Sequence, residues 1–367
     1  MSAPRVEIDL DKIHENARAL VHSLGTRGVS ITGVTKAMLG SPAIADAFTR
    51  AGVRSLGDSR IENIEALRSS KAPASLTLIR SPMMSQAARV VACADSSFNT
   101  ELEVITQLSA AAEASGKQHA VVLMVELGDL REGIMPADLE RMVGETLRLP
   151  SITFEGLGAN LACRYGVIPD SENMGRLSAL ADSIEATFGL TIGIVSGGNS
   201  ANLRWALGGA DCGRINDLRL GEAILLGRDP LDRRPIQGLH TDAIVLVAEV
   251  IESKIKSSRP AGVTAQAAFG QVPVPGDRGL VPQAILAVGR QDVDPDGLHP
   301  PRGIEISGAS SDHLIVHSGR ELLPVGAEIR FEPNYSALLR AMTSPFVGKV
   351  MRPVRDDVSP LGSSSWL

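Results

Sequence analysis

The stretch Ser30-Ile31-Thr32-Gly33-Val34-Thr35-Lys36-Ala37 is a largely apolar run with a lysine at its end. We predict that it forms a buried strand and that Lys36 lies at the mouth of this strand. An amine in such a place is desolvated, so its pKa falls and its neutral, nucleophilic form becomes populated. A neutral amine can form a Schiff base with a carbonyl cofactor. Because most lysines at strand ends are solvated surface charges, the hypothesis depends on the fold around Lys36.

Apolar runs alternate with amphipathic stretches along the first part of the chain. The eight candidate strands are residues 30–36, 53–58, 76–80, 95–99, 120–127, 152–160, 191–196 and 213–218. Candidate helices include residues 60–68, 85–92, 100–115, 137–147 and 172–188, and a first helix is expected from a cap at Asp11 to Gly25. This alternation favours parallel βαβ units, and eight of them favour a closed (β/α)8 TIM barrel. A doubly wound open sheet is the alternative, but no glycine-rich dinucleotide motif follows the first strand.

The pattern changes at a charged, proline-bearing connector over residues 228–235. Beyond it, short apolar runs are separated by clusters of Pro, Gly and Asp, which is typical of a β-domain. We therefore predict a cofactor-binding barrel over residues 1–232 and a mainly-β domain over residues 233–353. The tail, residues 354–367, has little apolar surface and is expected to be mobile.

Composition narrows the class of protein. The 367 residues are 44% apolar and 21% charged, which is typical of a large globular protein. The net charge of −6 without a basic cluster argues against a nucleic-acid or anionic-membrane partner. No apolar run is long enough to cross a membrane, and the acidic N-terminal segment does not resemble a secretory signal. Three scattered cysteines, Cys93, Cys163 and Cys212, lack metal-ligand spacing, so we expect a reduced, cytoplasmic enzyme without a metal.

Two glycine-bearing loops follow the seventh and eighth candidate strands, at residues 196–202 and 218–223. Barrel enzymes often hold a phosphate at these two positions. Small residues let backbone N–H groups approach an anion, and Ser200 adds a hydroxyl. Either loop alone would be interpreted as a tight turn. Together with Lys36 on the first strand, they predict a phosphorylated carbonyl cofactor, and pyridoxal 5'-phosphate fits best.

With these motifs in order, the chain resembles the alanine racemase-like enzymes of fold type III, which use pyridoxal phosphate, and most closely their ornithine racemase branch. The segments that carry the resemblance are residues 33–36, 56–63, 126–133, 156–163, 197–203, 216–227, 289–293, 308–313 and 334–335. The resemblance implies a racemase that acts on ornithine or another basic amino acid by two-base removal and return of the α-proton. It also implies a homodimer in which the β-domain of one chain completes the site of the other.

The resemblance assigns roles around the cofactor. Lys36 would hold the cofactor as a Schiff base, and Ser200 with the backbone N–H groups of Gly221 and Glu222 would bind its phosphate. Arg219 would bond the pyridine nitrogen. Because a guanidinium stays protonated, it would keep this nitrogen unprotonated and weaken the electron sink. A weaker sink suits racemisation, in which one proton is lost and regained.

Further roles concern the substrate and the ring. Arg131 would lie near the phenolic oxygen of the cofactor and the substrate carboxylate, Asp312 would contact the substrate, and Asn160 would lie against the ring face. The tyrosines that hold phosphate in alanine racemases have no counterpart in this alignment of motifs, with Gly40 and the neighbourhood of Thr343 at their places.

The second base has no obvious equivalent. Alanine racemases use a tyrosine from the partner subunit, and the matching position here is Arg290. Asp292, His313 and Cys163 are candidates because each can exchange a proton near neutral pH in a suitable environment. We rank Asp292 and His313 above Cys163.

Other functions and the substrate side chain stay open at this point. A lyase that resembles D-threonine aldolase would need a metal-binding His and Cys near the end of the β-domain, and residues 333–337 contain neither. A non-catalytic carrier of pyridoxal phosphate would resemble a single barrel without the second domain. Asp129, Glu132 and Glu222 are acidic groups near strand ends that could meet a terminal ammonium, although solvated surface carboxylates are common.

Overall fold

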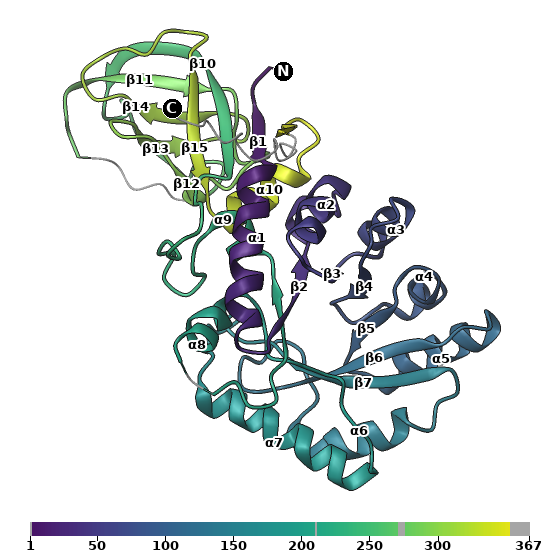
Figure 1. Cartoon of the computed structure of the whole chain (residues 1–367). Coiled ribbons are helices and arrows are strands. Elements are labelled where there is room, and N and C mark those ends of the chain that lie inside the picture. The colour runs from purple at the N-terminus through teal and green to yellow at the C-terminus, as the bar shows by residue number, and fades with distance from the viewer. Residues whose placement is uncertain (1, 210, 271–275, 353–367) are drawn as a thin grey trace, which may run out of the picture.

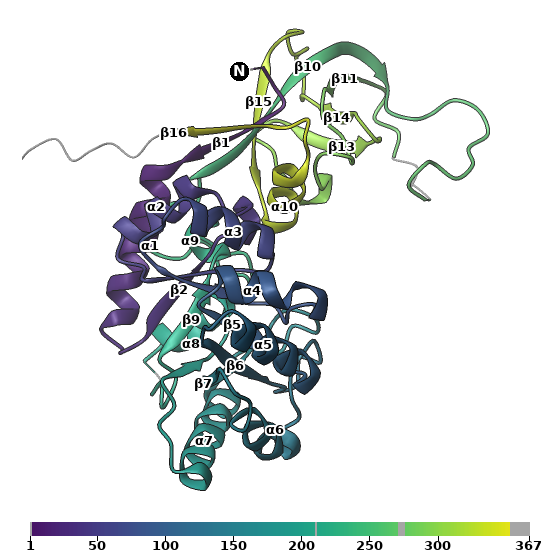
Figure 2. The same ribbon diagram turned by 90° about the vertical axis from the view of Figure 1, so that its right-hand side faces the viewer.

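The computed structural model describes residues 2–209, 211–270 and 276–352, which form a barrel and a second sheet (Figures 1 and 2). Eight parallel strands close the barrel in chain order from β2 to β9. They are β2 (Ser30–Val34), β3 (Ser55–Asp58), β4 (Ser75–Leu78), β5 (Ser96–Asn99), β6 (His119–Val125), β7 (Ile152–Ala159), β8 (Ile194–Ser196) and β9 (Asp217–Leu220). Each candidate strand of the sequence corresponds to one of these. The predicted closed barrel is confirmed, and the open doubly wound sheet is excluded.

Helices surround the barrel strands. They are α1 (Leu10–Gly25), α2 (Pro42–Arg50), α3 (Ile61–Ser69), α4 (Ala87–Cys93), α5 (Leu102–Ala114), α6 (Leu139–Thr146), α7 (Ser171–Phe188), α8 (Leu203–Leu207) and α9 (Glu222–Leu226). Short 3-10 turns lie at η1 (Lys36–Met38), η2 (Met84–Gln86), η3 (Pro136–Asp138), η4 (Ser200–Asn202) and η5 (Pro295–Gly297). The predicted cap of the first helix was wrong. Asp9 caps it by accepting a hydrogen bond from the Lys12 N–H at 3.2 Å, whereas Asp11 lies in its first turn.

The second sheet has eight strands and includes β1, the first strand of the described chain. Its main path runs β12-β15-β10-β11-β14-β13, and β1 pairs with both β10 and β16. The strands are β1 (Arg5–Asp9), β10 (Ile244–Ser257), β11 (Leu280–Leu286), β12 (Leu298–His299), β13 (Glu305–Ala309), β14 (Leu314–His317), β15 (Glu328–Pro333) and β16 (Gly348–Arg352). The mainly-β second part is confirmed. The boundary near residue 232 stays a prediction, and the tail over residues 354–367 lies outside the described residues.

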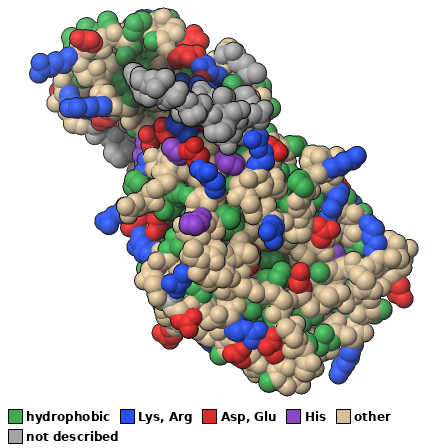
Figure 3. Space-filling view, viewed as in Figure 1, with side chains coloured by type: hydrophobic (Ala, Val, Ile, Leu, Met, Phe, Trp, Pro, Cys, Tyr) green, Lys and Arg blue, Asp and Glu red, His purple; other side chains and the backbone are tan. Residues whose placement is uncertain are grey.

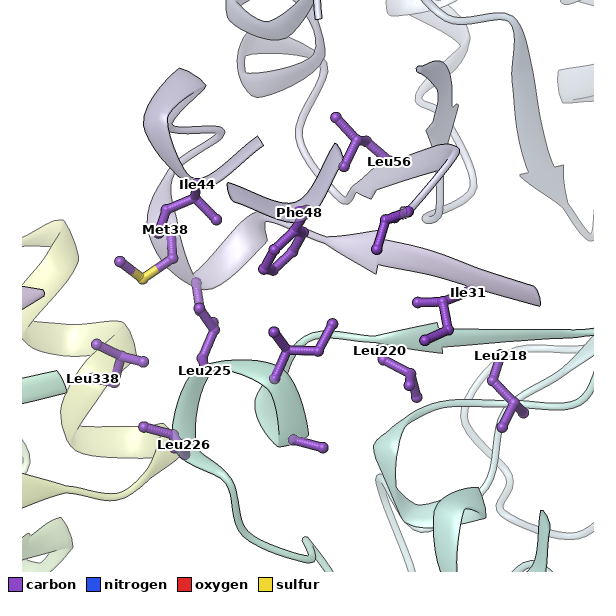
Figure 4. Close-up of a cluster of buried hydrophobic side chains, with 14 of the residues drawn as sticks. Ile31, Met38, Ile44, Phe48, Leu56, Leu218, Leu220, Leu225, Leu226 and Leu338 are labelled. Carbon is purple, nitrogen blue, oxygen red and sulfur yellow. The ribbon is translucent and has the colours of Figure 1, made fainter. Parts of the chain in front are cut away.

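One helix, α10 (Tyr335–Thr343), connects the second sheet to the barrel mouth. Asn334 caps it by accepting from the Ala337 N–H at 3.0 Å, and its Leu338 is fully buried. Figure 4 shows Leu338 beside Leu226 of α9, in the cluster that also contains Met38 of η1. The turn that carries Lys36 is therefore packed between the barrel and α10, which fixes the position of its backbone.

The carboxylate of Glu7 in β1 binds arginines of β1, β15 and β16. Figure 3 shows charged and histidine side chains gathered where the barrel meets the second sheet. Glu7 is 9% exposed and accepts hydrogen bonds from Arg330 at 2.7 Å, Arg5 at 2.9 Å and Arg352 at 2.9 Å. The Arg330 guanidinium, against the effect of burial and together with Arg5, lowers the pKa of Glu7 to about 2. This carboxylate therefore stabilises the fold in its charged form.

We expect Glu7→Gln to remove a stabilisation that depends on pH. Because the folded-state pKa lies below the unfolded value, the contribution is complete above about pH 4.5 and is lost as pH falls toward 2. The variant should lose on the order of 2 kcal/mol in free energy of unfolding at pH 6 and less than half as much at pH 3. Urea unfolding at both pH values measures this. The matched change Glu328→Gln, at a half-exposed partner of Arg5, should have a smaller effect.

Candidate active site

A cavity of about 400 Å³ opens at the carboxyl ends of the barrel strands. Parallel strands bring their carboxyl ends to one face of a barrel, and active sites form there. The lining residues are Val34, Lys36, Ser59, Ile79, Arg80, Ser81, Arg131, Glu132, Asn160, Asn199 and Arg219. Five residues singled out from the sequence therefore meet in one cavity: Lys36, Arg131, Glu132, Asn160 and Arg219.

Lys36 begins the 3-10 turn that follows β2, and buried polar contacts hold this turn. The Thr35 hydroxyl donates to Asp58 Oδ2 at 2.7 Å, and the Thr35 N–H donates to the Gly57 carbonyl at 3.0 Å. Asp58 is fully buried and also accepts from the Arg60 N–H and from Asn63. The backbone next to Lys36 is thus tied to the end of β3.

The environment of Lys36 favours a neutral amine. Burial, followed by the positive charge of Arg131, lowers its pKa, while Cys163 and Asp58 act in the opposite direction. The Lys36 Nζ atom also lies 5.8 Å from the centroid of the Tyr335 ring. The sequence-based expectation of a desolvated lysine at a strand mouth agrees with this geometry.

Arg219 projects from β9 into the barrel and is 5% exposed. Its Nη1 atom donates to Ser196 Oγ at 2.7 Å, and its Nη2 atom donates to the Ala159 carbonyl at 2.6 Å. The guanidinium lies 5.0 Å from the centroid of the Phe98 ring. Burial lowers the pKa of Arg219 to about 10, so the group stays charged at neutral pH.

Arg131 and Glu132 form an ion pair at the cavity wall. Burial acts against the charge of Arg131, but the Glu132 carboxylate outweighs burial and raises the Arg131 pKa. Arg131 Nη1 also donates to Cys163 Sγ at 3.1 Å. Cys163, ranked last among the candidate second bases, therefore contacts a residue that lines the cavity.

Asp129 fixes the loop that carries Cys163. It is 1% exposed and accepts from four backbone N–H groups, those of Cys163, Arg164, Tyr165 and Val167. Burial alone would raise its pKa, but these N–H groups hold the pKa of Asp129 below its usual range. Its acceptor capacity is therefore used by the protein, so Asp129 is not available to bind a substrate ammonium.

The two loops predicted to hold phosphate contact each other. The backbone N–H of Ala223, which follows Glu222, donates to Ser200 Oγ at 3.1 Å. A Cβ at position 221 would lie 3.0 Å from the Val34 carbonyl oxygen, a tight contact that favours glycine there. The side chain of Glu222 pairs with Arg233, and burial raises its pKa. The phosphate role of Ser200, Gly221 and Glu222 stays a prediction.

Asp292, His313 and Asp312 do not line this cavity within the described chain. Asp292 is 9% exposed and accepts from the Ser344 hydroxyl at 2.6 Å, within the mainly-β part of the chain. His313 is 43% exposed and pairs with Asp312 at 3.1 Å. Their roles stay predictions. Because they lie outside the cavity of their own chain, they would act only in the predicted homodimer, at the site of the other chain.

Asp58 and Tyr335, which lie beside the turn that carries Lys36, were not assigned roles from the sequence. The same holds for several residues that line the cavity, namely Ser59, Ile79, Arg80, Ser81 and Asn199. Asp58 directly ends a buried strand, and an acidic residue at this place in a barrel was a usable signal. Tyr335 is one of only two tyrosines and begins α10. Its approach to Lys36 joins residues almost 300 positions apart in the chain, and no local pattern predicts this contact.

Asn160, at the end of β7, holds an unsatisfied donor. Its Oδ1 atom accepts from Asn199 at 3.2 Å and from Arg219 at 3.4 Å. Its buried Nδ2 atom has no hydrogen-bond partner among the described residues. Because buried donors are rarely left unpaired, this atom is a candidate donor to a bound ligand.

Within residues 2–209, 211–270 and 276–352, no helix is long and apolar enough to cross a membrane.

The chain is similar to a known protein family and to individual relatives. Residues 8–229 match the family described as alanine racemase, N-terminal domain. The lysine racemase of Thermotoga maritima is 38% identical over 96% of this chain and 99% of its own length. The ornithine racemase of Acetoanaerobium sticklandii is 38% identical over 94% of this chain and 99% of its own length.

Solved structures agree on the fold. The alanine racemase from D-cycloserine-producing Streptomyces lavendulae superposes with a TM-score of 0.73 at 20% identity, covering 96% of this chain and 98% of that chain. At this identity the likeness concerns the fold alone. The family match and the two relatives together confirm the resemblance stated from the motifs: the chain belongs to the alanine racemase family.

Proposed function

We propose that this protein is a pyridoxal 5'-phosphate-dependent racemase of ornithine, lysine or another basic amino acid. The observation that carries the proposal is the desolvated Lys36 amine, which shares one cavity with Arg131 and Arg219. The two full-length relatives, a lysine racemase and an ornithine racemase, support both the reaction and the class of substrate.

The residues of the cavity fit the cofactor. Lys36 supplies an amine of lowered pKa for covalent attachment, and Asn160 supplies an unpaired buried donor. Arg219 offers a guanidinium to the ring nitrogen, and the contacting loops around Ser200 and Gly221 would receive the phosphate. When bound, pyridoxal phosphate withdraws electrons from the α-carbon and so acidifies its proton. The protein then has to move that proton and orient the substrate.

Two groups would exchange the α-proton, one on each face of the α-carbon. We assign Lys36 Nζ to one face because it lines the cavity and because burial lowers its pKa, which favours the neutral form that accepts a proton. The group on the other face would come from a partner subunit in a homodimer. Of the two higher-ranked candidates, His313 is the more available, since its ring is partly exposed while Asp292 is engaged by Ser344.

Glu132 would recognise the side-chain ammonium of a basic substrate. Arg80, Arg131 and Arg219 make the described cavity wall positively charged, and Glu132 is the one carboxylate that lines it. A substrate carboxylate that binds Arg131 would release Glu132 from its ion pair. The freed carboxylate could then accept the terminal ammonium.

We expect Glu132→Gln to reduce kcat/KM for ornithine by about 10-fold or more relative to norvaline. Norvaline has the carbon skeleton of ornithine without the terminal amine, so changes at Arg131 affect both substrates alike. Steady-state rates with both amino acids measure the ratio. An unchanged ratio would remove Glu132 from substrate recognition.

Chiral chromatography of a panel of L-amino acids, incubated with the cofactor-loaded protein, tests the proposed function. D-Ornithine or D-lysine should accumulate faster than D-alanine, D-serine or D-threonine. Cleavage of a β-hydroxy amino acid to glycine and an aldehyde would instead support the lyase. A protein that binds the cofactor and converts none of these amino acids would support the carrier.

A further inference from the structure

Asp217 and Arg219 point to the same side of β9, into the barrel, because alternate residues of a strand share a face. Asp217 is 7% exposed and lines a second cavity at the amino ends of the strands, whereas Arg219 lines the active-site cavity at the carboxyl ends. A buried carboxylate thus lies below a buried guanidinium in the same strand.

Ser196 of β8 bridges the two side chains. Its hydroxyl donates to Asp217 Oδ2, and the same oxygen accepts from Arg219 Nη1 at 2.7 Å. A hydroxyl has one proton, so donating it to Asp217 leaves the oxygen lone pairs free for Arg219. Asp217 therefore sets the direction of the hydrogen bond that Ser196 accepts.

Asp217 is held from the other flanking strand as well. Thr32 of β2 donates its hydroxyl to Asp217 Oδ1 at 2.8 Å. This second bond does not reach Arg219. The two hydroxyls therefore have different neighbours, although both bind the same carboxylate.

The other direct contacts of Arg219 do not supply a negative charge that would balance its positive charge. The Ala159 carbonyl and the Phe98 ring are neutral, and Arg131 at the cavity is cationic. Glu132 is the acidic group on the cavity side, and it is paired with Arg131. Burial raises the pKa of Asp217, and the Ser196 hydroxyl, the Arg219 charge and the Thr32 hydroxyl oppose this effect. In return, the negative charge of Asp217 opposes the effect of burial on Arg219.

We propose that Asp217 is a positioning residue that, through Ser196, fixes the orientation of the Arg219 guanidinium toward the cofactor ring. The proposal rests on the proposed function only in naming the ring nitrogen as the group that Arg219 meets. The competing interpretation is that Asp217 merely ties β2, β8 and β9 together.

Three variants separate these interpretations: Asp217→Asn, Ser196→Ala and Thr32→Val. The first two interrupt the path to Arg219, and the third removes a bond to Asp217 while leaving that path intact. Nitrogen-15 NMR of the arginine side chains, without cofactor and with Arg219 assigned by Arg219→Lys, reports the order of the guanidinium. Titration with pyridoxal phosphate, followed by absorbance, reports cofactor affinity.

We expect Asp217→Asn and Ser196→Ala each to broaden or shift the Arg219 side-chain resonances and to weaken cofactor binding by about 10-fold or more. Their double variant should lose little more than either one, because both act on one path. Thr32→Val should leave both readouts close to those of the unmodified protein.

Unchanged Arg219 resonances in Asp217→Asn, with only a lower unfolding temperature, would overturn the proposal. Equal changes in all three variants would also overturn it, because they would reflect the strand ties alone. If the unmodified protein fails to bind pyridoxal phosphate, the proposed function fails, and the cofactor-free resonances still decide the role of Asp217.

Discussion

Replacing Lys36 with alanine is expected to abolish covalent attachment of the cofactor and to reduce turnover by at least ~10³-fold. Lys36 has two proposed tasks, holding the cofactor and exchanging the α-proton, and it is the one lysine that lines the described cavity. Its loss therefore affects binding and chemistry together. The long-wavelength absorbance of lysine-bound cofactor and the rate of ornithine inversion measure the two losses.

A matched control is Lys349→Ala. Burial also lowers the pKa of Lys349, but this residue lies in β16 and donates to the Ser344 carbonyl, away from the cavity. The control should keep the absorbance and most of the activity. Retained turnover in Lys36→Ala would exclude Lys36 as the cofactor lysine.

Arg219→Glu is expected to cause the second large loss. The change removes the guanidinium that we propose for the ring nitrogen and places a carboxylate in the same buried face of β9 as Asp217. We expect a loss of about 3–5 kcal/mol in the free energy of unfolding, because a buried charge loses its partner. Racemisation should slow by at least ~10²-fold, since a positioned charge is missing at the reacting system. Urea unfolding measures the loss of stability, and chiral analysis of samples quenched at set times measures the rate of racemisation.

The double variant Arg219→Glu with Asp217→Asn separates repulsion from loss of function. It should recover part of the stability, because one of the two buried carboxylates becomes neutral, but it should recover little activity. If Arg219→Glu alone were as stable and as active as the unmodified protein, Arg219 would have no role at the ring.

The barrel could be predicted from the sequence because each of its strands is a short apolar run followed, in most cases, by a helical pattern. The N-terminal strand β1 was missed for a physical reason. Only Val6 and Ile8 alternate with charged residues there, and β1 becomes a strand by pairing with β10 and β16, more than 200 residues away. Helix α10 carried a usable signal in its Asn334 cap, but the surrounding β pattern obscured it.

The site was predictable where it depends on strand ends. Lys36, Arg131, Asn160 and Arg219 converge because the fold brings all these ends to one face. The contacts that fix their chemistry were not predictable, because they join distant side chains. The path from Asp217 through Ser196 to Arg219 and the approach of Tyr335 to Lys36 exist only once the barrel has closed and α10 has packed.

The most direct test of the proposed racemase activity is proton NMR of L-ornithine in heavy water with the cofactor-loaded protein. We predict that the α-proton signal disappears and that D-ornithine appears, as shown by chiral analysis of the same sample. Exchange without inversion would contradict a two-base racemase and point to another reaction of the same carbon. Full retention of the α-proton with ornithine and lysine alike would contradict the proposed function as a whole.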